Sequence, residues 1–146
     1  MQPDLNQIDL VARDVEATVA FYRAVGVDVP ESAIWRTASG AHHVDLTTPG
    51  GLIVHVDSEA LARVYDAGWR PPSGGGTRIV MSFHVATREE VDRLHAKLTG
   101  LGHRSMQAPY DAFWGSRYAI VEDPDGNHVG LMSPRDPSRN RPPPDL

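Results

Sequence analysis

Residues 117–132, RYAIVEDPDGNHVGLM, contain two short apolar runs separated by a polar turn. Within the turn, Pro124 fixes φ, Asp125 tolerates turn geometry, and Gly126 supplies a positive φ. The stretch therefore predicts a β-hairpin whose strands lie on either side of this turn. An earlier Pro-Gly-Gly turn at 49–51 predicts a second hairpin.

Outward from these hairpins, the chain divides into two halves with the same predicted order: strand, helix and three strands. Residues 6–12 alternate between apolar and polar side chains, as in a half-buried strand, and Asp14 is a typical cap for a following helix. The second half starts with the alternating stretch 78–86, and Thr87 caps its helix. The predicted strands are 6–12, 33–37, 42–47, 52–57, 78–86, 103–108, 116–121 and 128–132, and the predicted helices are 15–26, 58–67 and 88–101.

This order predicts an α+β fold of two paired βαβββ modules, at about 5–68 and 77–133, within one domain spanning 1–133. We expect them to form an open, curved mixed sheet with a concave cavity lined by side chains outside the core. The loop 71–76 links the halves. Residues 134–146 contain five prolines and three arginines, which predicts a flexible tail or an arm lying on a neighbour.

The composition is typical of a soluble globular protein and excludes several classes of function. The 146 residues carry a formal net charge of -5, which argues against a nucleic-acid partner and favours cationic or neutral ligands. The chain has no cysteine and therefore no thiolate metal site. We found no signal peptide and no apolar run long enough to span a membrane, so we expect a cytoplasmic protein.

The order of these motifs resembles the vicinal oxygen chelate superfamily, which includes glyoxalase I, extradiol dioxygenases, and fosfomycin- and bleomycin-resistance proteins. The resemblance rests on Asp14 with Phe21-Tyr22-Arg23, on Leu101-Gly102 at the end of the second-half helix, and on the turn 122–127. It covers roughly residues 5–133 and implies the same paired-module fold.

The resemblance implies that a metal, if bound, would be held at the positions of Gln7, His55, Val80 and Gly130. Gln7 and His55 could bind a metal, but Val80 and Gly130 have no side-chain ligand atom. A catalytic divalent site normally needs three protein ligands. We therefore expect no metal and no other cofactor. The alternative is one divalent metal at a rebuilt site, with Gln7, His55 and His84 as the fallback ligands.

Polar and aromatic side chains outside the predicted core are the candidates for ligand contact. For each histidine, an ordinary hydrogen-bonded side chain is the competing interpretation. Trp114 lies in the loop 111–117, where many family members have a similar Trp-Gly-x-Arg stretch. Loop aromatics can stack on flat ligands or contribute to a dimer interface. The candidate ligand-binding residues are Gln7, Asp9, Trp35, Asp45, His55, Asp57, Ser82, His84, Trp114, Arg117 and His128.

The function that these features favour is metal-free binding of a small aromatic or heteroaromatic compound, with drug sequestration as the biological role and a homodimer as the assembly. The resemblance also allows an enzyme: a lyase, isomerase or dioxygenase with an unusual metal site. A metal-free acid–base catalyst could use His84 or His55 with a nearby aspartate. A third possibility is a degenerate paralogue that mainly forms an interface with a partner.

Overall fold

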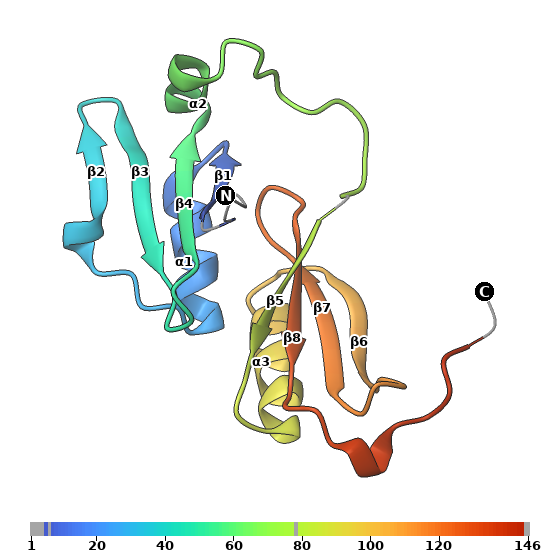
Figure 1. Cartoon of the computed structure of the whole chain (residues 1–146). Helices are drawn as coiled ribbons and strands as arrows, with labels where there is room; N and C mark the ends of the chain where they lie inside the picture. The colour runs from blue at the N-terminus through green and yellow to red at the C-terminus, as the bar shows by residue number, and fades with distance from the viewer. Residues whose placement is uncertain (1–4, 6, 78, 145–146) are drawn as a thin grey trace, which may run out of the picture. The chain divides into compact units, whose positions relative to one another are not determined.

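The computed structural model describes residues 5, 7–77 and 79–144. The chain divides into two compact units, Met1–Gly74 and Gly75–Leu146. Each unit contains one βαβββ module with a four-stranded mixed sheet, which confirms the predicted α+β fold class (Figure 1). The predicted concave cavity stays a prediction.

The first unit has a sheet with the strand order β1-β4-β3-β2, in which β1 runs parallel to β4 and the other neighbours are antiparallel. Its elements are β1 (Gln7–Ala12), α1 (Val15–Val25), a short 3₁₀ turn η1 (Glu31–Ala33), β2 (Ile34–Thr37), β3 (Gly40–Thr47), β4 (Ile53–Ser58) and α2 (Glu59–Tyr65). The parallel pairing brings the first and last strands of the module together at one edge of the sheet.

Helix α1 covers one face of this sheet. The Asp14 side chain accepts a hydrogen bond from the Ala17 amide at 3.0 Å, and Gly26, with φ of 113°, ends the helix. The helix buries Val15, Val19, Phe21, Tyr22 and Val25, and the strands bury Val44, Leu46, Val54 and Val56. The alternate strand residues therefore point to the opposite face, which α1 leaves open.

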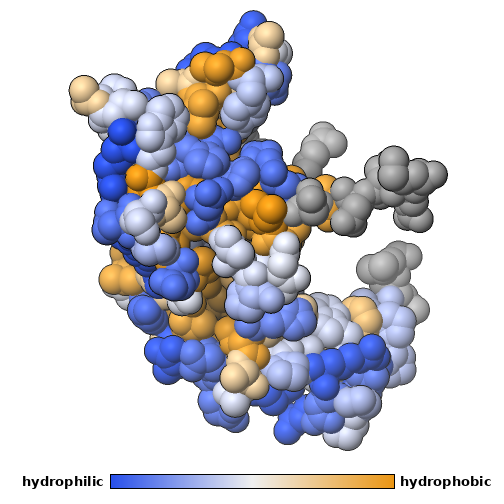
Figure 2. Space-filling model, turned by 60° about the vertical axis from the view of Figure 1, so that its left-hand side comes forward, coloured by the Kyte–Doolittle hydropathy of each residue, from blue (hydrophilic) through white to orange (hydrophobic). Residues whose placement is uncertain are grey.

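Helix α2 is shorter and packs less tightly. Ser58 caps it by accepting a hydrogen bond from the Leu61 amide, and Ala62 is its buried residue. Val64 is 80% exposed and Tyr65 is 54% exposed. Hydrophobic residues reach the surface at the top of Figure 2, at the height of α2 in Figure 1. Through Tyr65, this helix reaches the open face of the sheet, where it contacts Asp57.

The second unit repeats the arrangement, with the strand order β5-β8-β7-β6 and β5 parallel to β8. Its elements are β5 (Val80–His84), α3 (Arg88–Gly100), β6 (Ser105–Asp111), β7 (Arg117–Glu122), β8 (His128–Met132) and the 3₁₀ turn η2 (Pro137–Arg139). Thr87 caps α3. The core of this unit contains Val91, Leu94, Leu98, Ala119, Val121, Val129 and Leu131.

The turn between β7 and β8 forms where the sequence predicted it, and Asp123 organises it. This carboxylate is buried and accepts hydrogen bonds from the amides of Asp125 and Asn127, each at 2.9 Å, and from the Asn127 side chain at 2.8 Å. Gly126 has the expected positive φ, 86°.

The C-terminal segment was predicted to be a flexible tail or an arm on a neighbour, and in the structure Asp136 and Arg141 of this segment form hydrogen bonds with a loop of the same unit. The Asp136 amide donates to the Gly115 carbonyl at 3.2 Å, and the Arg141 amide donates to the Phe113 carbonyl at 2.8 Å. Gly115 has a φ of 91°, and a Cβ there would lie 2.6 Å from Asn140 Oδ1. The segment therefore fits against the loop 112–116 because position 115 has no side chain.

The described helices include none with the length and apolar character needed to cross a membrane.

Candidate functional site

The open face of the first sheet collects polar side chains from three strands. The register pairs Asp9 with His55, Asp45 with the same His55, and His43 with Asp57. Residues paired across neighbouring strands point to the same face, so these five side chains lie together.

Hydrogen bonds link these side chains across the sheet, beginning at strand β1. Gln7 Nε2 donates to Asp9 Oδ1 at 2.9 Å. Asp9 Oδ1 also lies 2.9 Å from His55 Nδ1, and the other ring nitrogen, His55 Nε2, lies 2.8 Å from Asp45 Oδ1. His55 is thus held between two carboxylates.

His43 continues this arrangement beyond Asp45. His43 Nε2 lies 3.3 Å from Asp45 Oδ1, and its Nδ1 lies 2.6 Å from Asp57 Oδ1. The Tyr65 hydroxyl donates to the other Asp57 oxygen at 2.9 Å. The imidazole rings of His43 and His55 are 4.7 Å apart. We call the whole set the histidine–aspartate chain; it consists of Gln7, Asp9, His55, Asp45, His43, Asp57 and Tyr65.

Two side chains of the histidine–aspartate chain have shifted pKa values because of their surroundings. Burial lowers the pKa of His43, but the hydrogen bond and negative charge of Asp57, with the charge of Asp45, outweigh it and raise the pKa above its ordinary value. Burial, followed by the hydrogen bond to Asp57, raises the pKa of the Tyr65 phenol far above its ordinary value. Tyr65 is therefore a hydrogen-bond donor at neutral pH.

Five of the predicted ligand-binding residues belong to the histidine–aspartate chain: Gln7, Asp9, Asp45, His55 and Asp57. His43 and Tyr65 were not predicted. His43 has a sequence signal, because it lies two residues before Asp45 on one strand and so shares its face. Tyr65 has none, because its contact depends on how α2 packs.

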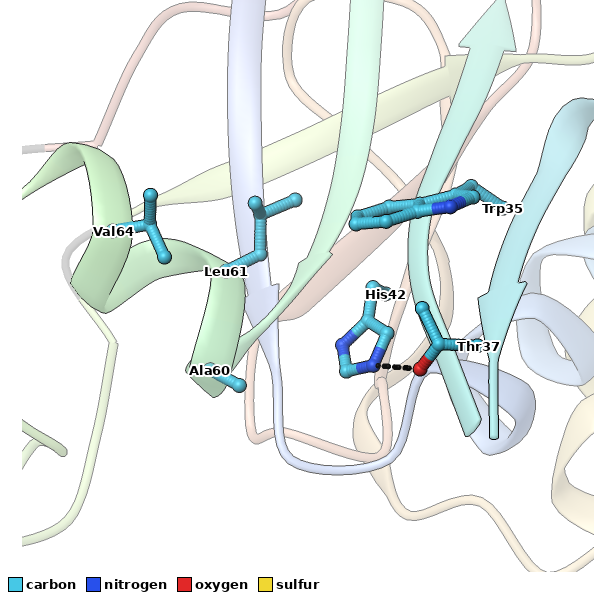
Figure 3. A pocket seen from close by; sticks show the side chains of 6 residues that line it. All are labelled: Trp35, Thr37, His42, Ala60, Leu61 and Val64. Atoms are coloured by element: carbon cyan, nitrogen blue, oxygen red, sulfur yellow. Dashed lines mark hydrogen bonds between the residues drawn. The ribbon is translucent and has the colours of Figure 1, made fainter. Parts of the chain in front are cut away.

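Trp35 lies elsewhere on this unit, 51% exposed, at an apolar pocket of about 170 Å³. Figure 3 shows Trp35 and His42 on one side of the pocket and the α2 side chains Leu61 and Val64 on the other. His42 Nδ1 lies 2.8 Å from Ser58 Oγ, whereas His43 contacts Asp57, so the two adjacent histidines point to different sides of β3. A drug-sized ligand needs about 300 Å³ or more, so this pocket alone is too small for one.

The open face of the second sheet has no carboxylate at the position that the resemblance gives to a metal ligand. Gly130 is buried there, and a Cβ on it would lie 2.6 Å from the Tyr118 phenol oxygen. That phenol lies 3.1 Å from Ser82 Oγ, so the two side chains occupy the space above Gly130. Val80 offers no ligand atom either. The residues present therefore do not fit the metal that the family's metalloenzymes hold at these positions.

Aromatic rings surround the same region. The ring centroid of Trp114 lies 5.5 Å from that of Tyr118 and 6.5 Å from that of Tyr110, and both pairs have edge-on geometry. Phe113 lies 5.1 Å from Trp114, also edge-on. We call Tyr110, Phe113, Trp114 and Tyr118 the aromatic cluster. Trp114 was a predicted ligand contact, and Tyr118 was missed because the alternation of β7 does not by itself identify the face that binds a ligand.

Arg117 is a predicted ligand contact of the second unit that lies away from the aromatic cluster. It pairs with Asp92 of α3 at 2.9 Å and with Asp111 at 3.1 Å. Alternation along β7 puts Arg117 on the helix-covered face and Tyr118 on the open face. By the same alternation His84 and His128 lie on the open face with Ser82, although none of the described hydrogen bonds joins them.

The fallback metal ligands are divided between the two units: Gln7 and His55 in the first, and His84 in the second. A site made from these three residues stays a prediction. Within the described part of the chain, His43, Asp45 and His55 form another group, in which one ligand atom from each residue lies within 4.8 Å of the others.

A sequence profile of the Glyoxalase/Bleomycin resistance protein/Dioxygenase superfamily matches residues 4–131. The structure is similar to that of a glyoxalase/bleomycin resistance protein/dioxygenase family enzyme from Burkholderia phytofirmans PsJN, with 26% sequence identity and a TM-score of 0.73. The match covers 90% of this chain and 98% of that one.

Two other solved structures show the same fold. Lactoylglutathione lyase from Agrobacterium tumefaciens is 21% identical, with a TM-score of 0.61 over 90% of this chain and 94% of that one. TioX from Micromonospora sp. ML1 is 22% identical, with a TM-score of 0.60 over 90% of this chain and 98% of that one. A comparison with curated protein sequences gave no significant match. Because the profile spans nearly the whole of both modules, the chain belongs to the Glyoxalase/Bleomycin resistance protein/Dioxygenase superfamily.

Proposed function

We propose that this protein binds a small, flat aromatic or heteroaromatic compound through the open face of its second sheet. The observation that carries the proposal is the aromatic cluster beside Gly130, where Tyr118 and Ser82 occupy the position of a metal ligand. Trp114 is half-buried, so part of its ring is held by protein and part remains accessible. An edge-on aromatic neighbour leaves a ring face available for stacking.

The polar groups of this face would orient the bound compound. Ser82 and Tyr118 offer hydroxyl groups, and the exposed His84 lies on the same strand as Ser82. The net charge of -5 favours a cationic or neutral compound. Val80 and Gly130 supply no ligand atom, so we propose that the compound is held without a metal or other cofactor at those positions. Sequestration of a drug-like compound is the biological role that we propose, in keeping with the resistance proteins named in the superfamily.

Replacement of Trp114 tests this proposal. Planar cationic and neutral compounds are first screened against the wild type by tryptophan fluorescence. Loss of stacking is worth about 0.5–1.5 kcal/mol, and the smaller leucine side chain also loses buried area, so Trp114→Leu should weaken binding by about tenfold or more. Trp69→Leu is the matched control, since Trp69 stacks with Arg63 in the other unit. Equal affinity of the wild type and Trp114→Leu for a tight ligand would refute the proposed site.

The second candidate is an acid–base enzyme. The observation that favours it is the contact of His55 Nδ1 with Asp9 at 2.9 Å, because a carboxylate that orients an imidazole is the usual arrangement of a general base. Mass spectrometry of a compound incubated with the protein separates the two functions. Unchanged compound supports the binding protein, whereas conversion that is lost in His55→Gln supports the enzyme.

A further inference from the structure

All four ring nitrogens of His43 and His55 face carboxylate oxygens, but a neutral imidazole can donate a hydrogen bond from only one of its two nitrogens. Each ring has its Nδ1 against a carboxylate: His43 against Asp57 at 2.6 Å, and His55 against Asp9 at 2.9 Å. An ionised carboxylate only accepts hydrogen bonds, so each Nδ1 must carry the proton and donate it. In a neutral imidazole the other nitrogen, Nε2, then presents a lone pair.

Both Nε2 atoms point at the same carboxylate oxygen. Asp45 Oδ1 lies 2.8 Å from His55 Nε2 and 3.3 Å from His43 Nε2. Two lone pairs facing an anionic oxygen are repelled by it, so the arrangement requires positive charge between them. A proton on each Nε2 or a single metal ion would supply it.

We propose that His43 Nε2, His55 Nε2 and the Asp45 carboxylate bind one divalent transition-metal ion of the zinc type. Zinc binds imidazole nitrogen and carboxylate oxygen at about 2.0–2.2 Å, which puts tetrahedral ligand atoms roughly 3.3 Å apart. Two of the three separations are 2.8 and 3.3 Å, and each of the three residues offers a ligand atom within 4.8 Å of those of the other two. Asp45 is 57% exposed and can shift to accommodate the ion, with water at a fourth position.

A carboxylate behind each imidazole fixes the orientation of the ring. Histidines that bind metals usually donate their other N–H to a carboxylate, which fixes the tautomer, and here Asp57 and Asp9 take that role. Tyr65 donates to Asp57 and Gln7 donates to Asp9, so each carboxylate is itself oriented. Two neutral imidazoles with three carboxylates leave three negative charges, and a divalent ion reduces that excess to one.

The donor set also selects the class of ion. Two imidazole nitrogens and one carboxylate suit zinc and similar first-row ions, whereas Mg²⁺ and Ca²⁺ prefer oxygen ligands alone. The site shares His55 with the positions implied by the resemblance, but its other ligands differ, because His43 and Asp45 come from β3 and neither Val80 nor Gly130 takes part. It does not rest on the aromatic-ligand proposal, which concerns the other unit.

Zinc titration of the full chain, freed of metal with a chelator, tests the proposal by calorimetry at near-neutral pH. We expect one ion per chain and micromolar or tighter affinity. His43→Gln and His55→Gln should each weaken binding by about 100-fold or more, and Asp57→Asn by about 10–100-fold. His42→Gln is the matched control, because His42 faces Ser58 and should leave the affinity unchanged.

Imidazole nitrogen NMR of the wild type provides a second measurement that needs no variant. Zinc should move the Nε2 resonances of two of the seven histidines, while their Nδ1 atoms stay protonated. Three results would overturn the proposal: no binding at micromolar zinc, binding that survives both His43→Gln and His55→Gln, or an equal loss in His42→Gln. If a variant does not fold, absence of the two Nε2 shifts in the wild type overturns it alone.

Discussion

At Gly130, the absence of a side chain lets the Tyr118 ring lie across strand β8. A Cβ at this position would lie 2.6 Å from the Tyr118 oxygen and 2.8 Å from its Cε2 atom, closer than unbonded atoms can approach. The same absence removes the carboxylate that the family's metalloenzymes need. One small residue thus opens space for an aromatic ring and removes a metal ligand.

Gly130→Ala should therefore destabilise the fold through overpacking, by about 1–3 kcal/mol in the free energy of unfolding. Part of that loss should disappear when the same substitution is made together with Ser82→Ala and Tyr118→Phe, which remove the two colliding oxygens but leave the contact with the ring carbon Cε2. Urea denaturation measures both effects. Gly100→Ala is the control, since a Cβ there meets no atom within 4 Å. An undiminished loss in the triple variant would show that the two oxygens do not cause it.

The residues of the site were predictable to different degrees. Alternation in 6–12 and 52–57 is enough to predict that Asp9, His55 and Asp57 lie on the face away from the core. The same rule extends to His43, which lies two residues before Asp45 on one strand. It does not extend to Tyr65, because the contact of Tyr65 with Asp57 depends on how α2 packs. The role of Arg117 as a ligand contact stays a prediction, and its ion pairs with Asp92 and Asp111 could not be predicted because they join residues that are remote in the chain.

At the scale of elements, the loop 112–116 and the segment 134–141 stabilise each other. Two backbone hydrogen bonds join them, and the Arg141 side chain donates to the Asp111 carbonyl. The hairpins were predictable because proline and glycine fix turn geometry locally. The docking of the C-terminal segment was not, because its hydrogen bonds use backbone groups that any residue possesses.

Deleting residues 134–146 should loosen the loop that bears Trp114. Three lost hydrogen bonds at about 0.5–1.5 kcal/mol each suggest a loss of about 2 kcal/mol, which would lower Tm by several degrees. Near-ultraviolet circular dichroism should also show a weaker tryptophan signal. A chain that ends at Arg141 keeps these contacts and serves as the control. Equal Tm values for the two truncated chains would show that the segment does not stabilise the loop.

At the scale of the whole molecule, the described residues form two sheets whose outer strands pair on one side only, and such edges promote association unless they are protected. Edge strand β5 and its preceding residue expose apolar side chains: Ile79 is 59% exposed and Val80 is 47% exposed.

We therefore propose that the chain forms a homodimer, and light scattering should report about twice the chain mass of 16.0 kDa. Charge on an edge opposes strand pairing, so Val80→Lys should shift the population toward monomer. Val64→Lys, on α2, should leave the mass unchanged. A wild type that stays monomeric at micromolar concentration would contradict the homodimer, whereas a dimer that persists in Val80→Lys would exclude only the β5 edge as its interface.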